Sequence, residues 1–431
     1  MPCNSLQAFS PFTPRPNRGF SNSFTLLELL IVIGIIAVLG SVTFIALNPV
    51  ETIRASRDTQ RFSDLDALNK SVNMAVIENT STNLGTASTV YVSLPDTSST
   101  CGSWSLPTLP SGWAYHCAAS STYTMTDGTG WLPVNLAALS TGSPISHDPL
   151  DPSNDVTHYY QYVPNPSQTT WELASVMESS KYKMGGSNDK TSTDGGGNVS
   201  LYEKGTDLTL VPVDSGDQSL VGWWKFDEGS GGTAYDASGD GYNGTISGAT
   251  WITRKNGYAL SFPDPYCCSS KTVLIGKQSK LQFNASQSFS ASAWFNPANG
   301  GSTYGSMIFS NSWGGPAPTG WRLTGSASGI TVTLQDGTHA AGLSTSTAIL
   351  DTWHLITVSV NRNTQNMTLY LDGLSVGTTN ISPIGDLTSI YNFDIGNNDN
   401  GNNFNGLIDD VRVYSRALSD PEIQAIYNAT K

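Results

Sequence analysis

The hydrophobic pattern of the chain starts with one uninterrupted apolar run. From Leu29 to Leu47 no residue is charged, and a single acid, Glu28, stands directly before these 19 residues. At about 1.5 Å per residue, a helix of this length can cross the apolar core of a bilayer. A cleaved secretory signal usually has a shorter apolar core of about 7–15 residues. The pattern therefore predicts a membrane-spanning helix, and Arg15 and Arg18 predict that the segment before it stays cytoplasmic.

Beyond the apolar run the pattern becomes that of an amphipathic helix over residues 47–76. The apolar positions recur at helical spacing: Ile53, Phe62, Leu65, Leu68, Val72 and Val76. The charged positions are expected on the opposite, solvated face: Glu51, Arg54, Arg57, Asp58, Arg61 and Asp64. Pro49 predicts a kink or a local opening of the helix. We expect one long helix whose second half packs on a globular head.

Two segments with different residue patterns follow the helix. Residues 77–182 contain short β-branched and aromatic runs between Pro and Asn turns, which predicts a small antiparallel sheet laid on the helix. Within it, residues 158–178 predict a strand pair joined over residues 164–168. Residues 183–217 are rich in Gly, Ser, Asp and Thr and predict a flexible linker, although "LYEKGTDLTLVPVDSG" (201–216) can add a strand before the next domain.

Residues 218–431 alternate between short apolar runs and Gly, Asn or Asp turns. That pattern, over some 200 residues, predicts an antiparallel two-sheet sandwich or jelly roll. A short closing helix is expected after Ser419, the N-cap, with Pro421 in the first turn and Glu422 three residues after the cap.

Composition narrows the possible functions. The net charge is −13 and no basic stripe is visible, which argues against nucleic-acid binding. Few charged residues (13%) and many turn-forming residues are typical of extracellular β-rich domains. Acidic oxygens also suit hard cations such as Ca²⁺.

The five cysteines form no C-x-x-C pair and no cluster with zinc spacing. Cys101 and Cys117 can close a short loop as a disulfide, worth roughly 3 kcal/mol in the chain-entropy model; the alternative is two buried free thiols. The adjacent Cys267 and Cys268 can form a strained vicinal disulfide or remain two thiols.

The stretch "FTLLELLIVIGIIAVLG" (24–40) resembles the N-terminal segment of type IV pilins and pseudopilins. The resemblance implies that a prepilin peptidase cuts the Ser23–Phe24 bond, that the new amine is methylated, and that Glu28 pairs with this amine on a neighbouring subunit. A buried charge needs such a partner. One departure is that the family's cut normally follows Gly. A cut between Gly19 and Phe20 is therefore the alternative, although it would make Glu28 the ninth mature residue instead of the fifth. The remaining interpretation is that the segment is an uncleaved membrane anchor.

The stretches "LVGWWKFDEGSGGTAYDASGDGYNGTISGATW" (220–251) and "FNGLIDDVRVYSRALSDPEIQAIY" (404–427) resemble the opening and closing of a concanavalin A-like, laminin-G-like jelly roll. Members of this group mostly bind sugars or proteins, and some bind Ca²⁺ at one edge of the sandwich. The candidate Ca²⁺ ligands are Asp236, Asp240, Asn243 and Asp409; the alternative is that the first three are turn residues holding a Gly-rich loop. The candidate sugar-stacking residues are Trp313, Trp321, Tyr304 and Trp251.

Catalytic motifs are missing from the sequence. It contains no E-x-D-x-x-E strand of the jelly-roll glycoside hydrolases, no G-x-S-x-G, no H-E-x-x-H and no P-loop, so we expect no enzyme.

The expected architecture is an α+β multidomain protein. Its parts are a leader (1–23), a pilin helix (24–76, with 24–47 in the membrane), a pilin-like head (77–182), a linker (183–217) and an all-β jelly roll (218–431).

The first function hypothesis is a minor or tip-located subunit of a surface filament. It starts in the bacterial inner membrane, assembles with other pilin subunits after processing, and binds a glycan or a surface protein through the jelly roll. The alternatives are a pseudopilin of a type II secretion or DNA-uptake machine that uses the jelly roll for docking, and a membrane-anchored carbohydrate-active enzyme or receptor.

Overall fold

The computed structural model describes residues 25–79, 81–254, 257–263, 271–298, 307–312, 318–326, 329–345, 351–397 and 403–431. Contacts within the chain divide it into two compact units, residues 1–52 and residues 53–431. Each unit is described by itself.

The N-terminal part of the chain is helical. Helix α1 (Leu26–Leu47) begins after the N-cap Thr25 and ends at Asn48, whose backbone is left-handed with φ of 37°. Helix α2 (Pro49–Glu78) begins at Pro49, because proline lacks the N–H that a first turn leaves unpaired. The expected opening at Pro49 is confirmed. Within the described residues, no helix has both the length and the apolarity of a membrane span.

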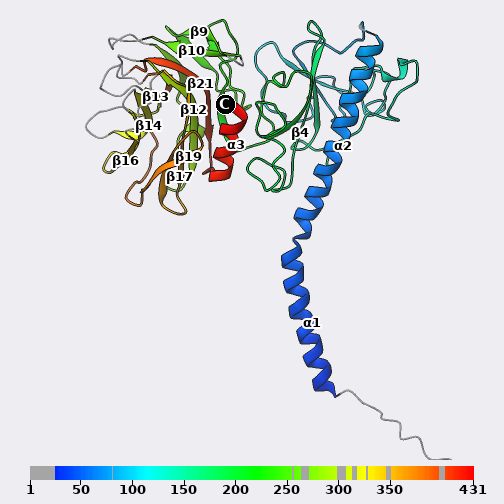
Figure 1. The fold of residues 1–431 in the computed structure, drawn as a ribbon, viewed down its shortest axis with the longest axis horizontal. Helices are drawn as coiled ribbons and strands as arrows, with labels where there is room; N and C mark the ends of the chain where they lie inside the picture. Colours follow the sequence, from blue (N-terminus) through cyan, green and yellow to red (C-terminus); the bar gives the residue numbers. More distant parts are fainter. Residues whose placement is uncertain are drawn as a thin grey trace, which may run out of the picture. The chain divides into compact units, whose positions relative to one another are not determined.

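A five-stranded sheet, here called the head sheet, lies on α2 (Figure 1). Its strands run in the order β2-β1-β3-β4-β5 within the described ranges: β1 (Thr89–Val92), β2 (Ala114–Cys117), β3 (Tyr160–Asn165), β4 (Thr170–Val176) and β5 (Leu201–Gly205). Leu65, Leu68 and Val72 of α2 are buried against one face of the sheet. The hairpin β3–β4 matches the strand pair expected in 158–178, but β2 pairs with β1 in parallel, so the sheet is mixed.

Two charged positions of α2 are not on a solvated face. Asp58 and Arg61 are 0% exposed, whereas Ile53, expected on the packed face, is 55% exposed. Arg61 donates to both carboxylate oxygens of Asp151 at 2.6 and 2.7 Å and to Glu178 at 2.6 Å. The helix period predicted a solvated position because the acids that pair with Arg61 lie about 90 and 120 residues further along the chain.

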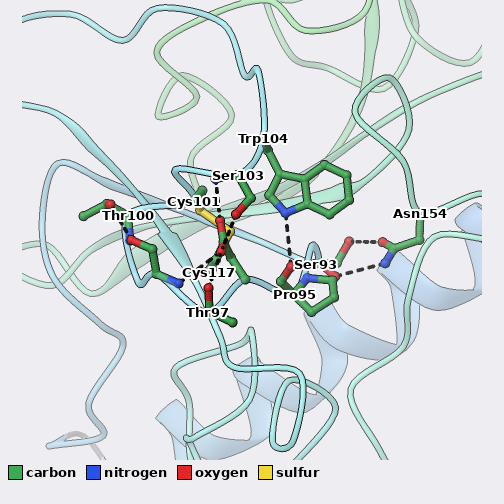
Figure 2. Close-up of a disulfide and its surroundings, with 11 residues drawn as sticks. Ser93, Pro95, Thr97, Thr100, Cys101, Ser103, Trp104, Cys117 and Asn154 are labelled. Carbon is green, nitrogen blue, oxygen red and sulfur yellow. Dashed lines mark hydrogen bonds between the residues drawn. A yellow bond between two sulfur atoms is a disulfide. The ribbon is translucent and has the colours of Figure 1, made fainter.

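A disulfide joins Cys101 to Cys117, with the two Cα atoms 5.2 Å apart (Figure 2). It ties the loop after β1 to the last residue of β2. Close by, the Trp104 indole N–H donates to the Pro95 carbonyl at 3.1 Å, and Ser103 donates through its backbone N–H to Asp96 at 2.8 Å. Cys267 and Cys268 lie outside the described residues.

The segment 183–217, expected to be a flexible linker, is largely packed against the rest of the unit. It contributes β5, which pairs with β4, and it buries Val199 and Val213 at 1% exposure. Asp189 accepts hydrogen bonds from the backbone N–H groups of Gly185 at 2.7 Å and of Thr191 at 3.0 Å. Polar composition suggested a solvated chain, but its aspartates bind its own backbone and hold it in place.

The C-terminal part is a β-sandwich, here called the sandwich, built from two sheets around one apolar core. Within the described ranges one sheet has the order β19-β18-β17-β12-β21-β10-β9, with β6 also paired to β21: β6 (Leu220–Trp224), β9 (Thr250–Thr253), β10 (Tyr258–Phe262), β12 (Phe289–Pro297), β17 (His354–Asn361), β18 (Asn366–Leu371), β19 (Leu374–Asn380) and β21 (Gly406–Tyr414). The other has the order β16-β15-β14-β13-β20-β11-β8-β7: β7 (Thr233–Ala234), β8 (Gly244–Ser247), β11 (Thr272–Gly276), β13 (Met307–Ser310), β14 (Thr319–Ser326), β15 (Gly329–Asp336), β16 (Ala340–Thr345) and β20 (Phe393–Ile395). Single 3-10 turns are formed by Leu136–Ala138 in the head and Ser279–Leu281 in the sandwich.

Helix α3 (Asp420–Thr430) closes the chain with the expected capping box of Ser419 and Glu422 and with proline in its first turn. Ile423 and Ile426 are buried beside Trp294 of β12, so α3 covers the outer face of the first sheet (Figure 1). The head sheet and the sandwich belong to one compact unit. Direct contacts join them, such as the hydrogen bond from Asp214 N–H to the Ala237 carbonyl at 2.7 Å.

Candidate functional site

The first candidate site is the start of α1. The Glu28 carboxylate accepts hydrogen bonds from the backbone N–H and the hydroxyl of Thr25, both at 2.9 Å, and so caps its own helix. The apolar residues on both sides of Glu28 are exposed: Leu26, Leu27, Leu29, Leu30, Ile31, Val32, Ile33, Ile35 and Ile36. Consecutive exposed apolar residues are typical of surfaces that contact another protein or a membrane. The two possible cleavage bonds, at Ser23–Phe24 and Gly19–Phe20, lie outside the described residues.

The residues predicted to bind Ca²⁺ form hydrogen bonds and ion pairs within the chain. Asp236 is 2% exposed and accepts hydrogen bonds from the N–H groups of Trp223, Ser238 and Tyr242 at 2.9–3.0 Å. Its own N–H donates to the Asn243 side chain at 2.9 Å. Burial raises the pKa of Asp236, which these donors only partly offset. The side chains therefore hold the loop 236–243 in the manner of turn residues.

The other two acids form ion pairs. Asp240 contacts Lys280 at 2.5 Å, and Asp409 on β21 is paired with Arg254. In the part of the chain that the structure describes, no three His, Cys, Asp or Glu residues gather as a metal-binding group. The set Asp236, Asp240, Asn243 and Asp409 does not fit a cation as it is arranged here, and Ca²⁺ binding stays a prediction.

The aromatic residues expected to stack on sugars have different positions. Trp321 is 0% exposed and lies among the rings of Phe289, Phe309 and Phe393 in the sandwich core, with centroids 5.0–5.6 Å away. It belongs to the core and offers no face to a ligand, because its position on β14 points inward. Trp313 and Tyr304 lie outside the described residues. Trp251 is half-buried and donates to the Gly231 carbonyl at 3.0 Å.

A hollow of about 280 Å³ opens at one end of the first sheet of the sandwich. Its lining comes from strand ends and adjoining loops: Ser261, Pro263, Asn296, Ala298, Asp351, Asn405, Gly406 and Leu407. Ser261 on β10, Leu407 on β21 and Asn296 on β12 form one row across three neighbouring strands. Hydroxyl, amide and carboxylate groups here lie beside apolar side chains.

The next row along the same strands carries an aromatic and charged cluster. Trp294 pairs in register with Asp409, two residues from the row of Asn296 and Leu407. The Arg254 guanidinium lies over the rings of Trp294 and Trp353, at 5.0 and 4.4 Å from their centroids. This stacking, together with the ion pair to Asp409, fixes the arginine.

The sequence pattern does not predict this hollow. Its residues come from four places between 261 and 407, and no two of them form a motif. The only available signal was the alternation of strands β10, β12 and β21, which predicts that Ser261, Asn296 and Leu407 point away from the core.

Two parts of the chain match known protein families. Residues 15–44 match the prokaryotic N-terminal methylation motif, and residues 269–424 match the concanavalin A-like lectin/glucanase superfamily. No curated protein matches the chain.

Similar solved structures include two binding domains. The binding domain of Paraclostridial Mosquitocidal Protein 1 is 18% identical with a TM-score of 0.42, over 49% of this chain and 52% of that one. The binding domain of Botulinum Neurotoxin serotype G is 16% identical with a TM-score of 0.40, over 48% of this chain and 50% of that one. The chain thus spans about half the length of the structures it matches.

The methylation motif, the helix that contains most of it and the sandwich lie in one polypeptide. The chain joins a type IV pilin N-terminal methylation segment to a concanavalin A-like, laminin-G-like jelly-roll domain.

Proposed function

We propose that this protein is a pilin-like subunit of a bacterial surface filament, minor or tip-located, and that its sandwich binds a glycan or a surface protein. One observation carries the proposal: a methylation motif runs into a helix with exposed apolar residues, and the same chain ends in a concanavalin A-like domain. The large second domain favours a rare or terminal position, because a close-packed filament body has little room for it. The proposed role is binding without catalysis.

The proposed assembly starts in the inner membrane. A prepilin peptidase cuts before Phe24, and the new amine stands one residue before the N-cap Thr25. Within the described residues, the Glu28 carboxylate accepts hydrogen bonds from Thr25 of its own chain. In the filament the amine of a neighbouring subunit replaces part of this contact, because a carboxylate and an ammonium group removed from water stabilise each other. The pairing sets the register between subunits.

Replacing Glu28 by valine is expected to stop assembly while processing continues. The valine helix keeps its apolar surface but loses the only acid near the new amine. Filament yield is measured after shearing, and the N-terminal peptide by mass spectrometry. The expected peptide starts at methylated Phe24; a start at Phe20 would select the other bond.

Asp66→Asn is the matched control, since Asp66 lies further along α2 and forms a solvent-exposed ion pair with Lys70. It is expected to assemble normally. Normal filaments from Glu28→Val, or a chain that keeps Met1, would contradict the assembly proposal.

The ligand is proposed to occupy the hollow lined by Asn296 and Asn405. The double variant Asn296→Ala, Asn405→Ala is expected to lower glycan affinity about tenfold, because each lost hydrogen bond costs about 0.5–1.5 kcal/mol. A glycan array with the full chain in detergent measures binding. Ser344→Ala, on β16 of the other sheet, is the control and is expected to bind like the wild type.

The same array is run with Ca²⁺ and with EGTA. Bound Ca²⁺ would have to displace Lys280 from Asp240 or Arg254 from Asp409. Glycan binding that depends on Ca²⁺ would support the predicted metal site, and equal binding with EGTA would remove it. Glycan binding that is unchanged in the double variant would move the ligand away from the hollow.

A further inference from the structure

Two glutamates lie side by side inside the head sheet. Glu172 on β4 pairs in register with Gly205, and Ala174 pairs with Glu203 on β5, so the two acids are diagonal neighbours on one face. This is the face turned away from α2, because Leu173, the residue between Glu172 and Ala174, packs on the α2 side. Glu172 is 0% exposed and Glu203 is 2% exposed.

The hydrogen bonds of this pair are incomplete. One oxygen of Glu172, Oε2, accepts from the N–H groups of Leu210 and Val211 at 2.7 and 2.8 Å. Within the described residues, no donor reaches the buried Oε1 of Glu172 or the buried Oε2 of Glu203. The register of β4 and β5 places the two carboxyl groups within reach of each other on this face. Two ionised carboxylates in this position would repel each other without solvent, whereas one shared proton converts the contact into a hydrogen bond.

Few other charges surround the pair. Asp194, in the loop before β5, accepts the Glu203 N–H at 2.7 Å and adds negative charge. Lys225, directly after β6, is the cation whose charge acts on both glutamates. Burial raises the pKa of Glu172 and of Glu203, and Lys225 only partly offsets this. Burial likewise raises the pKa of Asp194 to about 7.

The pair is covered by a segment that also holds the sandwich. A side chain at Gly196 would overlap the Glu203 carboxyl, so this glycine backbone lies directly on the acid. The next carbonyl, of Gly197, accepts a hydrogen bond at 3.2 Å from the Arg412 guanidinium on β21. Val199 is packed in the same apolar cluster as Trp223 of β6. Segment 194–200 therefore contacts the glutamates on one side and the sandwich on the other.

We propose that Glu172 and Glu203 share a single proton that keeps segment 194–200 closed, and that loss of this proton loosens the junction between the head sheet and the sandwich. Two ionised carboxylates under Gly196 repel each other, and water reaches them only if the segment lifts. Lifting it breaks the contact of Gly197 with Arg412 and withdraws Val199. The pair acts as a pH-sensitive latch.

The direction of the pH dependence follows from the raised pKa values of Glu172 and Glu203. An acid whose pKa is higher in the folded state stabilises that state fully below its unfolded value of about 4.5, and this contribution is lost as the pH rises through the folded value. The latch is therefore closed in acid and opens toward alkaline pH.

Hydrogen exchange of the full chain in detergent tests this. After correction for the intrinsic pH dependence of exchange, protection of amides 195–200 is expected to fall at least tenfold between pH 6 and pH 9 in the wild type. In Glu203→Gln the amide N–H₂ can donate to Glu172 permanently, so protection there is expected to stay constant. Glu172→Gln, which donates in the opposite direction, is a second variant with the same expected result.

Asp66→Asn, on the exposed face of α2, is the control and should keep the wild-type pH dependence. Constant protection of 195–200 in the wild type overturns the latch, even if neither glutamine variant folds. Variants that open like the wild type also overturn it. If Ca²⁺ or EDTA changes the wild-type protection at fixed pH, a cation and not a proton joins the carboxylates, and the proposal fails.

Discussion

Replacing Arg61 by alanine is expected to destabilise the unit 53–431 by about 3–5 kcal/mol, the usual cost of removing one partner of a buried ion pair. Asp58 and Asp151, whose side chains are 0% exposed, would lose the arginine, and Glu178, whose side chain is 7% exposed, would lose one of its two arginines. Arg57 also contacts Glu178 but is 36% exposed and does not replace the bidentate contact to Asp151. Urea denaturation followed by circular dichroism measures the loss.

Lys70→Ala is the matched control for this variant. Lys70 pairs with Asp66 on the surface of the same helix, and such exposed pairs contribute about 0.3–0.5 kcal/mol. Arg61→Ala with a loss as small as that of Lys70→Ala would show that the acids of the network do not need the arginine.

The same network predicts a dependence on acid. Burial alone would raise the pKa of Glu178, but hydrogen bonds from Arg57 and Arg61 outweigh it and lower the pKa to about 2. An acid with a lowered pKa stabilises the fold above its unfolded value of about 4.5, and the contribution is lost as the pH falls toward 2. The difference between wild type and Arg61→Ala is therefore expected to shrink between pH 5 and pH 2.

Replacing Trp321 by alanine is expected to cost the sandwich about 3–5 kcal/mol, as for other large core side chains. The indole fills the space between Phe289, Phe309 and Phe393, and alanine would leave a cavity lined by aromatic rings. Thermal denaturation followed by near-ultraviolet circular dichroism measures the loss of the packed core.

Trp321→Phe separates packing from ligand binding. Within the described residues the Trp321 indole N–H has no acceptor, so phenylalanine loses volume but no hydrogen bond. We expect a cost of about 1 kcal/mol and unchanged glycan binding. A Trp321→Phe variant that keeps its stability but loses its ligand would contradict the placement of Trp321 in the core.

Local pattern predicted much of the architecture. The break at Pro49, the hairpin β3–β4 and the cap of α3 at Ser419 depend on neighbours within a few residues, and the structure has all three. The alternating runs of 218–431 likewise predicted a sandwich. These features follow from backbone geometry and from the period of apolar residues, which a single sequence displays.

Composition predicted solvent exposure poorly where polar side chains form hydrogen bonds or ion pairs within the chain. Segment 183–217 reads as a solvated linker, yet Asp189 holds its turns, and β5 completes the head sheet. Asp58 and Arg61 read as surface charges, yet their partners come from distant loops. Burial of a polar group depends on whether a distant partner satisfies it, and spacing along the chain does not reveal that partner.

By itself, the sequence determined the two ends of this protein: an apolar helix with Glu28 at its start, and an alternating β-domain closed by α3. These are properties of consecutive residues. Only the tertiary structure decided which polar groups meet. In the tertiary structure Trp321 is buried in the core and Asp409 forms an ion pair with Arg254. Asn296 lines a hollow, and Glu172 and Glu203 are diagonal neighbours on one face of the head sheet. Such meetings depend on strand order and register, because residues far apart in the chain become neighbours only when the sheets form.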